Sequence, residues 1–245
     1  MELHGAKVLI TGGTSGIGRK TVDLLAKENA NVIVVARDQH KLDRLWAEGA
    51  IAGAYCCDLA DPQAVVLLAE KLAVDHPDLQ VLINNAGLQH NVGFDEDAST
   101  PQTIREELNT NLLAPLLLIR VLLPTLVKQT QAAIVNVTTG LALVPKTSSA
   151  VYCGTKGGLR IFTKALQNQL EGTSIRAIEI LPPVVDTPMT AGRGTNKMAP
   201  DKVANEIVHA IKGKRDEVFV GKTKLLHWVS RLSPGMARRI MKRLG

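Results

Sequence analysis

Aromatic residues are scarce in this sequence of 245 residues: they make up 3% of it, although hydrophobic residues reach 45%. The core must therefore be built from Val, Ile, Leu and Ala, which suits helices packed on a parallel sheet. Cysteine is scarce too, with only Cys56, Cys57 and Cys153 and no CxxC pair. We therefore expect neither a disulfide framework nor a metal site, and a reducing cytoplasm is the simplest expected location.

Long hydrophobic runs are also missing. Residues 1–5 lack the basic start of a signal peptide, and the apolar run at 8–10 is too short to be one. The most apolar stretch, residues 112–123, is interrupted by Pro115 and Arg120. We therefore do not expect this stretch to span a bilayer.

The net charge of +6 is unevenly distributed along the chain. Residues 212–245 hold ten Lys/Arg and two Asp/Glu, a net charge of +8, so the remainder carries about −2. Within residues 222–245, apolar residues recur at roughly helical spacing from Leu225 to Leu244, with Arg and Lys between them. We expect this basic amphipathic tail to pack on its own subunit or on a neighbour. Peripheral contact with an anionic membrane is the first alternative, and nucleic acid the least favoured one.

Short β-branched runs alternate with amphipathic segments over residues 1–221. The predicted strands are 7–10, 31–36, 51–56, 81–84, 133–137, 174–181 and 217–220, and the predicted helices include 18–28, 62–75, 101–127 and 150–170. This alternation predicts a single α/β domain: a doubly wound, seven-stranded parallel sheet of the Rossmann type, with helices on both faces. Ligands of such sheets lie beyond the carboxyl ends of the strands.

A glycine-rich segment follows the first predicted strand. It reads Thr-Gly-Gly-Thr-Ser-Gly-Ile-Gly over residues 11–18 and leads into a predicted helix. Glycines at such a turn let backbone N–H groups and the helix N-terminus approach a pyrophosphate. The candidate cofactor-binding residues here are Gly12, Thr14, Ser15, Gly16, Ile17 and Gly18.

The end of the second predicted strand indicates which dinucleotide is bound. A site for NAD usually places a carboxylate there, on the ribose 2′-hydroxyl. This chain has Ala36 followed by Arg37, and a guanidinium can pair with a 2′-phosphate, so NADP(H) is favoured over NAD(H). The alternative is a solvated arginine, with Asp38 competing for its charge.

Tyr152 and Lys156 are four residues apart on a predicted helix, so the phenol and the ammonium lie on one face. A neighbouring cation lowers the pKa of a tyrosine from about 10, which would allow Tyr152 to exchange protons with a carbonyl or an alcohol. Asn111 lies in an apolar helix four residues before Pro115, which has no N–H to donate to the Asn111 carbonyl. That carbonyl needs another partner, and a water is the natural one.

The glycine segment, the Tyr-x-x-x-Lys pair and Asn-Asn-Ala-Gly at 84–87 together resemble the short-chain dehydrogenase/reductase family over roughly residues 5–220. The strings at 84–89, 134–145 and 181–188 are most similar to a bacterial branch named after an oxidoreductase of the D-alanyl-lipoteichoic acid operon. The resemblance implies that Tyr152 is the acid/base, Lys156 its partner and a ribose ligand, and Asn111 the anchor of a proton-relay water. It implies further cofactor contacts at Asp58, Leu59, Asn85, Gly87, Val185 and Thr187.

Two positions depart from the family pattern. Thr139 stands where the family has a serine that orients the substrate, and its methyl group restricts the rotamer; Thr138 is the nearby alternative. Pro183 replaces a glycine, which removes an N–H and stiffens the turn.

The sequence therefore predicts reversible hydride transfer between NADP(H) and a small carbonyl or alcohol substrate. By analogy with the family, we expect a homodimer or homotetramer formed through residues 101–127 and 150–170. Two alternatives stay open at this point. One is a non-catalytic NADP(H)-binding redox sensor, and the other is a membrane-peripheral reductase of a lipid-linked substrate.

Overall fold

A computed structural model describes residues 1–243 and places seven parallel strands in one sheet, in the order β3-β2-β1-β4-β5-β6-β7. The strands are β1 (Lys7–Thr11), β2 (Asn31–Ala36), β3 (Gly53–Cys56), β4 (Val81–Asn84), β5 (Ala132–Val137), β6 (Ile175–Leu181) and β7 (Glu217–Phe219). The strand order reverses between β1 and β4, which is where such sheets bind their ligands. The predicted doubly wound parallel sheet is confirmed.

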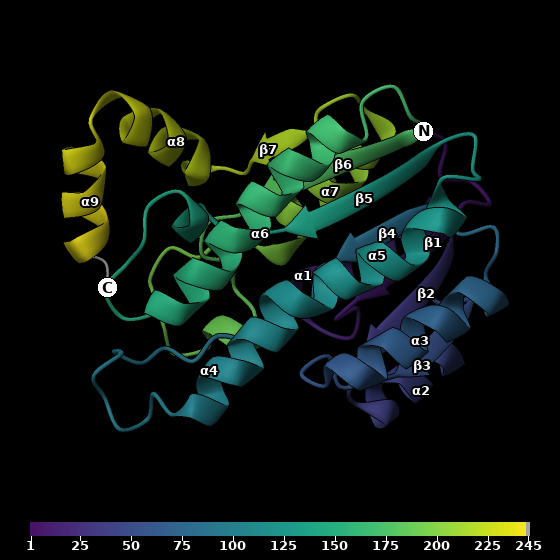
Figure 1. Ribbon diagram of the computed structural model, residues 1–245, viewed down its shortest axis with the longest axis horizontal. Helices are drawn as coiled ribbons and strands as arrows, with labels where there is room; N and C mark the ends of the chain where they lie inside the picture. Colours follow the sequence, from purple (N-terminus) through teal and green to yellow (C-terminus); the bar gives the residue numbers. More distant parts are fainter. Residues whose placement is uncertain (244–245) are drawn as a thin grey trace.

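Helices cover both faces of the sheet (Figure 1). They are α1 (Gly16–Lys27), α2 (Gln39–Ala47), α3 (Pro62–Asp75), α4 (Pro101–Leu108), α5 (Ala114–Leu126), α6 (Ala150–Gln169), α7 (Pro200–Lys212), α8 (Lys222–Leu232) and α9 (Pro234–Arg243). Side chains alternate along each strand, so Val8 and Ile10 pack with α1, α2 and α7, whereas Leu9 packs with α3, α5 and α6. Two aliphatic cores result, one on each face.

The helix predicted over residues 101–127 is not uniform. A π-helical turn, η1 (Asn109–Leu113), joins α4 to α5, and Ala114 donates its N–H to the carbonyl of Asn109. Pro115 follows directly, and a proline cannot supply the regular hydrogen bond to Asn111. The wider turn therefore occurs where the sequence indicated an irregular helix.

The run Pro101–Leu126 is long and apolar enough, with a mean hydropathy of 1.4, to cross a membrane by length and composition alone. It lies on the sheet as part of the α/β body (Figure 1). Leu118, Leu122 and Leu126 are fully buried in the core beneath it. Its buried side chains belong to the core of the α/β fold.

The basic tail, for which the sequence indicated helical spacing, forms two helices. Ser233 leaves the helical conformation, at φ −146° and ψ 80°, because the residue before a proline disfavours it, and α9 begins at Pro234. In Figure 1, α8 and α9 stand beside the end of β7, outside the layers that cover the sheet. Leu244 and Gly245, the end of the predicted tail, lie outside the described residues.

Candidate active site

One large cleft opens at the carboxyl edge of the sheet, with a volume of about 2070 Å³. This exceeds the 300–1,000 Å³ typical of a site for a single small ligand. Sixteen of the seventeen predicted site residues line it: Gly12, Thr14, Ser15, Gly16, Ile17, Gly18, Arg37, Asp58, Leu59, Asn85, Gly87, Thr139, Tyr152, Lys156, Val185 and Thr187. The cleft has room for a dinucleotide and a substrate together.

The glycine segment at residues 11–18 has the shape of a phosphate cradle. Gly12 and Gly16 adopt φ values of +68° and +53°, which favour glycine. A Cβ on Gly18 would lie 2.1 Å from the carbonyl oxygen of Gly12, so no larger residue fits there. Ser15 precedes α1 without a side-chain capping bond, which leaves the first N–H groups of the helix for an anion. A pyrophosphate fits this arrangement.

Thr11, which was not among the predicted site residues, joins this cradle to the loop after β4. Its hydroxyl oxygen accepts hydrogen bonds from the N–H groups of Asn85 (3.1 Å) and Ala86 (3.0 Å). The side-chain amide of Asn85 donates in return to the Thr11 carbonyl oxygen at 3.0 Å. The two cofactor-facing loops therefore form one bonded unit.

Arg37 directly follows β2 and lines the cleft, as does its neighbour Asp38. Asp38 caps α2 by accepting from the Lys41 N–H at 3.1 Å, and its second oxygen lies 3.2 Å from Lys41 Nζ. These contacts with Lys41 hold the pKa of Asp38 below its usual value. Asp38 is thus paired with Lys41, so it does not compete for Arg37 as the alternative interpretation required.

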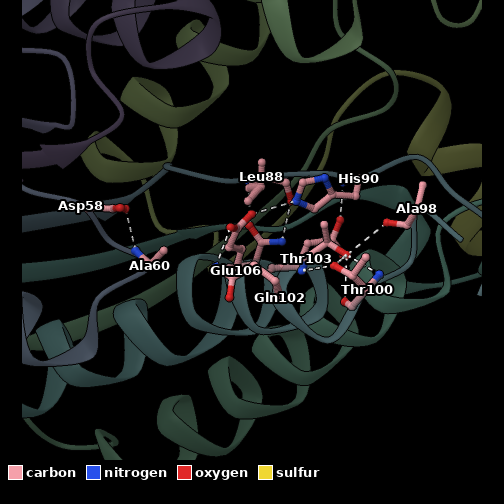
Figure 2. Close-up of polar contacts among 11 residues, drawn as sticks. Asp58, Ala60, Leu88, His90, Ala98, Thr100, Gln102, Thr103 and Glu106 are labelled. Atoms are coloured by element: carbon pink, nitrogen blue, oxygen red, sulfur yellow. Dashed lines mark hydrogen bonds and ion pairs between the residues drawn. The ribbon is translucent and has the colours of Figure 1, made fainter.

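Asp58 lies at the rim of the cleft, where one of its carboxylate oxygens accepts from the Ala60 N–H at 2.9 Å (Figure 2). This short turn positions the segment after β3. Asn109 of η1 steadies the same segment by donating to the Ala60 carbonyl at 2.8 Å. Asn109 was missed because its role depends on a contact between residues 49 positions apart.

Asn111 is the one predicted site residue that does not line the cleft, because it is fully buried. Its side-chain amide pairs with the backbone of Leu88: the oxygen accepts from the Leu88 N–H at 2.8 Å, and the nitrogen donates to the Leu88 carbonyl at 2.7 Å. The nitrogen also lies 3.3 Å from the hydroxyl of Thr155, in the turn of α6 that carries Lys156. Asn111 thus fixes the loop after β4 against α6.

The loop of residues 88–99 is held to α4 by two carboxylates (Figure 2). Glu107 accepts from the N–H of His90, and Glu106 lies 3.3 Å from the His90 ring. Glu107 is 1% exposed, and burial raises its pKa. His90 therefore has a structural role, because it holds the loop after β4 against α4.

Tyr152 and Lys156 project from the first turns of α6 into the cleft, 8% and 3% exposed. Lys156 Nζ donates to the Val137 carbonyl at 2.9 Å, at the end of β5. A Cβ built on Gly87 would lie 3.6 Å from the same nitrogen, so the ammonium also adjoins the loop after β4. α6 thus carries the pair to the point where β4 and β5 end.

The electrostatics of this pair differ from the expectation. The sequence indicated that Lys156 would lower the pKa of Tyr152, but burial of the phenol dominates and raises that pKa above its ordinary value. Burial also lowers the pKa of Lys156 to about 8. Tyr152 is accordingly held in its protonated form, which is the form that donates a proton.

Thr138 and Thr139 have different surroundings at the end of β5. The Thr138 hydroxyl donates to the buried carboxylate of Glu179 at 2.7 Å, and Glu179 is paired with Arg160 of α6. Thr139 lines the cleft, and its hydroxyl accepts from the N–H of Leu141 at 3.3 Å. Both threonines line the cleft, but the Thr138 hydroxyl is committed to the buried carboxylate, so Thr139 remains the candidate hydroxyl for a substrate.

The segment after β6 closes over the glycine cradle. Val185 forms an isolated parallel bridge with Met198, and the Met198 N–H donates to the Val184 carbonyl at 3.0 Å. A Cβ on Gly16 would lie 2.9 Å from the Thr187 methyl group, so the two segments touch because Gly16 has no side chain. Pro183 lines the cleft at the start of this segment.

Comparisons with known proteins agree with this geometry. The sequence matches the family model for "short chain dehydrogenase" over residues 6–198. It is 36% identical to the "Uncharacterized oxidoreductase DltE" of Bacillus subtilis, covering 82% of this chain and 78% of that protein. It is 32% identical to the "Ketoacyl reductase HetN" of a Nostoc species, over 99% of this chain and 90% of that one.

The fold is shared with solved structures as well. A short chain dehydrogenase from Burkholderia cenocepacia, in complex with NADP, superposes with a TM-score of 0.87 at 24% identity, covering 98% of this chain and 99% of that one. Other structures of this fold contain NADP, NADH or NAD. The chain is an oxidoreductase that belongs to the short-chain dehydrogenase family.

Proposed function

We propose that this protein is an NADP(H)-dependent oxidoreductase that interconverts a carbonyl compound and its alcohol, with Tyr152 as the general acid/base. The observation that carries the proposal is the shared cleft. The buried pair Tyr152 and Lys156 opens into the same space as the glycine cradle at residues 11–18. NADP(H) supplies the hydride in this chemistry.

The chain's own residues handle the proton. Because burial keeps Tyr152 protonated, its hydroxyl can donate to the oxygen of a carbonyl that is being reduced. The Thr139 hydroxyl, which lines the same cleft, orients that oxygen. Lys156 holds the cofactor ribose and stabilises the phenolate that forms, and Asn111 anchors the relay that returns a proton.

Preference for NADP(H) over NAD(H) is supported by the charges at the end of β2. Arg37 and Lys41 both line this part of the cleft. No carboxylate follows β2 directly, and Asp38 is occupied with capping α2. A planar guanidinium suits a 2′-phosphate, which it can contact through two N–H groups.

The cleft also suits a substrate with an apolar portion. Leu141, Leu226, Val229 and Met189 are among its lining residues. We therefore propose a carbonyl or alcohol compound that carries a hydrocarbon group.

We also propose a homodimer or homotetramer in the cytoplasm. Leu113 and Val127, at the two ends of α5, are 36% and 53% exposed, and Ile161 of α6 is 66% exposed. These apolar side chains lie on the helices through which we expect subunits to pair, and pairing would remove them from water.

The first experiment measures oxidation of NADPH and of NADH with a panel of aldehydes, ketones and diketones. Turnover should require NADPH and should fall at least a thousandfold in Tyr152→Phe, which removes only the acidic hydroxyl. Tyr55→Phe is the matched control because Tyr55 is the one other tyrosine. Its hydroxyl donates to Asp75 on α3, and it does not line the cleft. Equal turnover by Tyr152→Phe and the wild type would refute the assignment.

Arg37→Gln tests the cofactor preference. We expect its KM for NADPH to rise at least tenfold with little change for NADH, because a 2′-phosphate loses its partner. Arg44→Gln, an exposed arginine on α2, is the matched control. Tight NADPH binding without turnover of any carbonyl would instead favour the redox-sensor alternative.

A further inference from the structure

The outer face of the α8–α9 hairpin is apolar and exposed. Leu225, Trp228 and Leu232 of α8 are 69%, 55% and 82% exposed, and Met236 and Ile240 of α9 are 56% and 44% exposed. On α8 the spacing of three and then four residues puts the side chains on one helical face, and on α9 the spacing of four does the same. Packing within the subunit therefore does not account for this face.

The inner side of the hairpin is where it packs. Leu226 and Val229 of α8 line the cleft, and the ring of His227 stacks on Phe219 at the end of β7. Ala237 of α9 is fully buried, and α9 packs against α8. The hairpin is thus a folded part of the enzyme. Leu225 and Ile240 also border the cleft, whereas Trp228, Leu232 and Met236 are more than half exposed and do not line it.

The charge of the hairpin has a single sign. Residues 222–242 contain six Lys/Arg and no Asp or Glu: Lys222, Lys224, Arg231, Arg238, Arg239 and Lys242. Lys224 and Arg231 are seven residues apart, so they lie on one side of α8, next to the face that carries Trp228. All six of these side chains are exposed. Cations therefore flank the exposed apolar side chains of α8.

We propose that the α8–α9 hairpin binds the surface of an anionic phospholipid bilayer. Trp228, Leu232 and Met236 enter the boundary between headgroups and acyl chains, and the Lys and Arg side chains contact lipid phosphates. Tryptophan favours this interfacial depth, because its ring is apolar and its N–H remains near water. This proposal is independent of the reaction in the cleft.

Two other occupants fit the surface less well. A second copy that paired through the same face would bring the flanking cations of the two copies, including Lys224 and Arg231, close together, which is unfavourable. Nucleic acid would satisfy the charges but would leave Leu232 and Met236 without an apolar environment. An anionic bilayer alone offers both negative charge and an apolar phase.

The test uses the full-length protein and vesicles of phosphatidylglycerol and phosphatidylcholine. We expect sedimentation with mixed vesicles, no binding to pure phosphatidylcholine, and release by 1 M NaCl, at which the screening length is about 3 Å. In a Trp46→Phe background, Trp228 is the one remaining tryptophan. Its fluorescence emission should shift to shorter wavelength when vesicles are added, and titration of this shift gives the partition coefficient.

Matched variants locate the binding surface. Arg231→Gln/Arg238→Gln/Arg239→Gln should weaken partitioning roughly a hundredfold, at about fivefold for each charge near an anionic surface. The same charge is removed elsewhere by Lys27→Gln/Arg44→Gln/Lys128→Gln, which should leave partitioning within a fewfold of the wild type.

The apolar contribution is tested by Leu232→Ser, which should weaken partitioning about tenfold or more. Leu67→Ser removes an equally exposed leucine from α3, and we expect no effect from it. Three results would overturn the proposal: no binding to anionic vesicles, equal losses in the hairpin and control triples, or an oligomer that dissociates in Leu232→Ser. The proposal would also be contradicted if the hairpin triple variant lost binding to DNA but kept its binding to anionic vesicles.

Discussion

Replacing Lys156 by methionine should make the protein more stable while it abolishes turnover. Lys156 is 3% exposed, and burial lowers its pKa from 10.5 to about 8. A difference of one in pKa corresponds to 1.36 kcal/mol, so burying the charged ammonium costs about 3 kcal/mol at pH 7. Methionine has a similar length and no charge, and the loss of one hydrogen bond to Val137 offsets only about 1 kcal/mol.

The net gain of about 2 kcal/mol corresponds to a rise in Tm of roughly 4–8 °C for a chain of this size. The assay is thermal unfolding followed by circular dichroism at several pH values, with Lys128→Met, at an exposed lysine, as the control. Between pH 8 and 10.5 the unfolded chain binds more protons at Lys156 than the folded one, so wild-type stability rises with pH. The advantage of the variant should therefore shrink over that range.

Turnover by the wild type should fall over the pH range in which its stability rises. Because Lys156 loses its charge as the pH rises through about 8, reduction of a carbonyl should slow above that pH. A Lys156→Met variant that is no more stable than the wild type at pH 7, or whose advantage is the same at pH 7 and pH 10, would refute the reasoning.

Two further substitutions test the architecture of the site. Gly18→Ala should abolish NADPH binding in a fluorescence titration and lower Tm, because its Cβ would lie 2.1 Å from the Gly12 carbonyl oxygen. Gly154→Ala is the control: open space surrounds this position, so neither NADPH binding nor Tm should change. Arg160→Met should cost about 3–5 kcal/mol in urea unfolding, because the 1%-exposed Glu179 carboxylate loses its cationic partner and keeps only the Thr138 hydroxyl. Burial already raises the pKa of Glu179, so this loss should grow as the pH rises from 5 to 8, and a loss independent of pH would contradict the explanation.

The sheet could be predicted because its strands are short β-branched runs. The predicted boundaries of β2 and β4 match the structure, and those of the other strands differ by one or two residues. β3, for instance, begins at Gly53 and not at residue 51. α2 escaped prediction because only Leu42 and Leu45 are buried on an otherwise polar segment. α7 has a clear pattern of buried apolar residues, including Val203, Ile207 and Ile211, and could have been found.

Most of the candidate site could also be anticipated, because its residues follow the strand ends in chain order. What the sequence concealed depends on tertiary contacts. The pKa of Tyr152 is governed by burial that no local pattern encodes. The pairing of Asn111 with Leu88 and of Thr138 with Glu179 joins residues 23 and 41 positions apart. That the inner face of α8 lines the cleft could not be predicted for the same reason. Amphipathic spacing does not reveal which part of the protein a helix packs against.

The Thr11 hydroxyl has a consequence for how a dinucleotide is bound. Since one oxygen accepts from the N–H groups of both Asn85 and Ala86, the loops at the two halves of the dinucleotide site are already rigid relative to each other when the chain has folded. A bound dinucleotide then loses its own torsional freedom but orders little of the protein, which favours tight and rapid binding. Binding of one half of the dinucleotide therefore does not change the part of the site that binds the other half. Fragments of the dinucleotide that occupy only one end of the site should bind independently of each other.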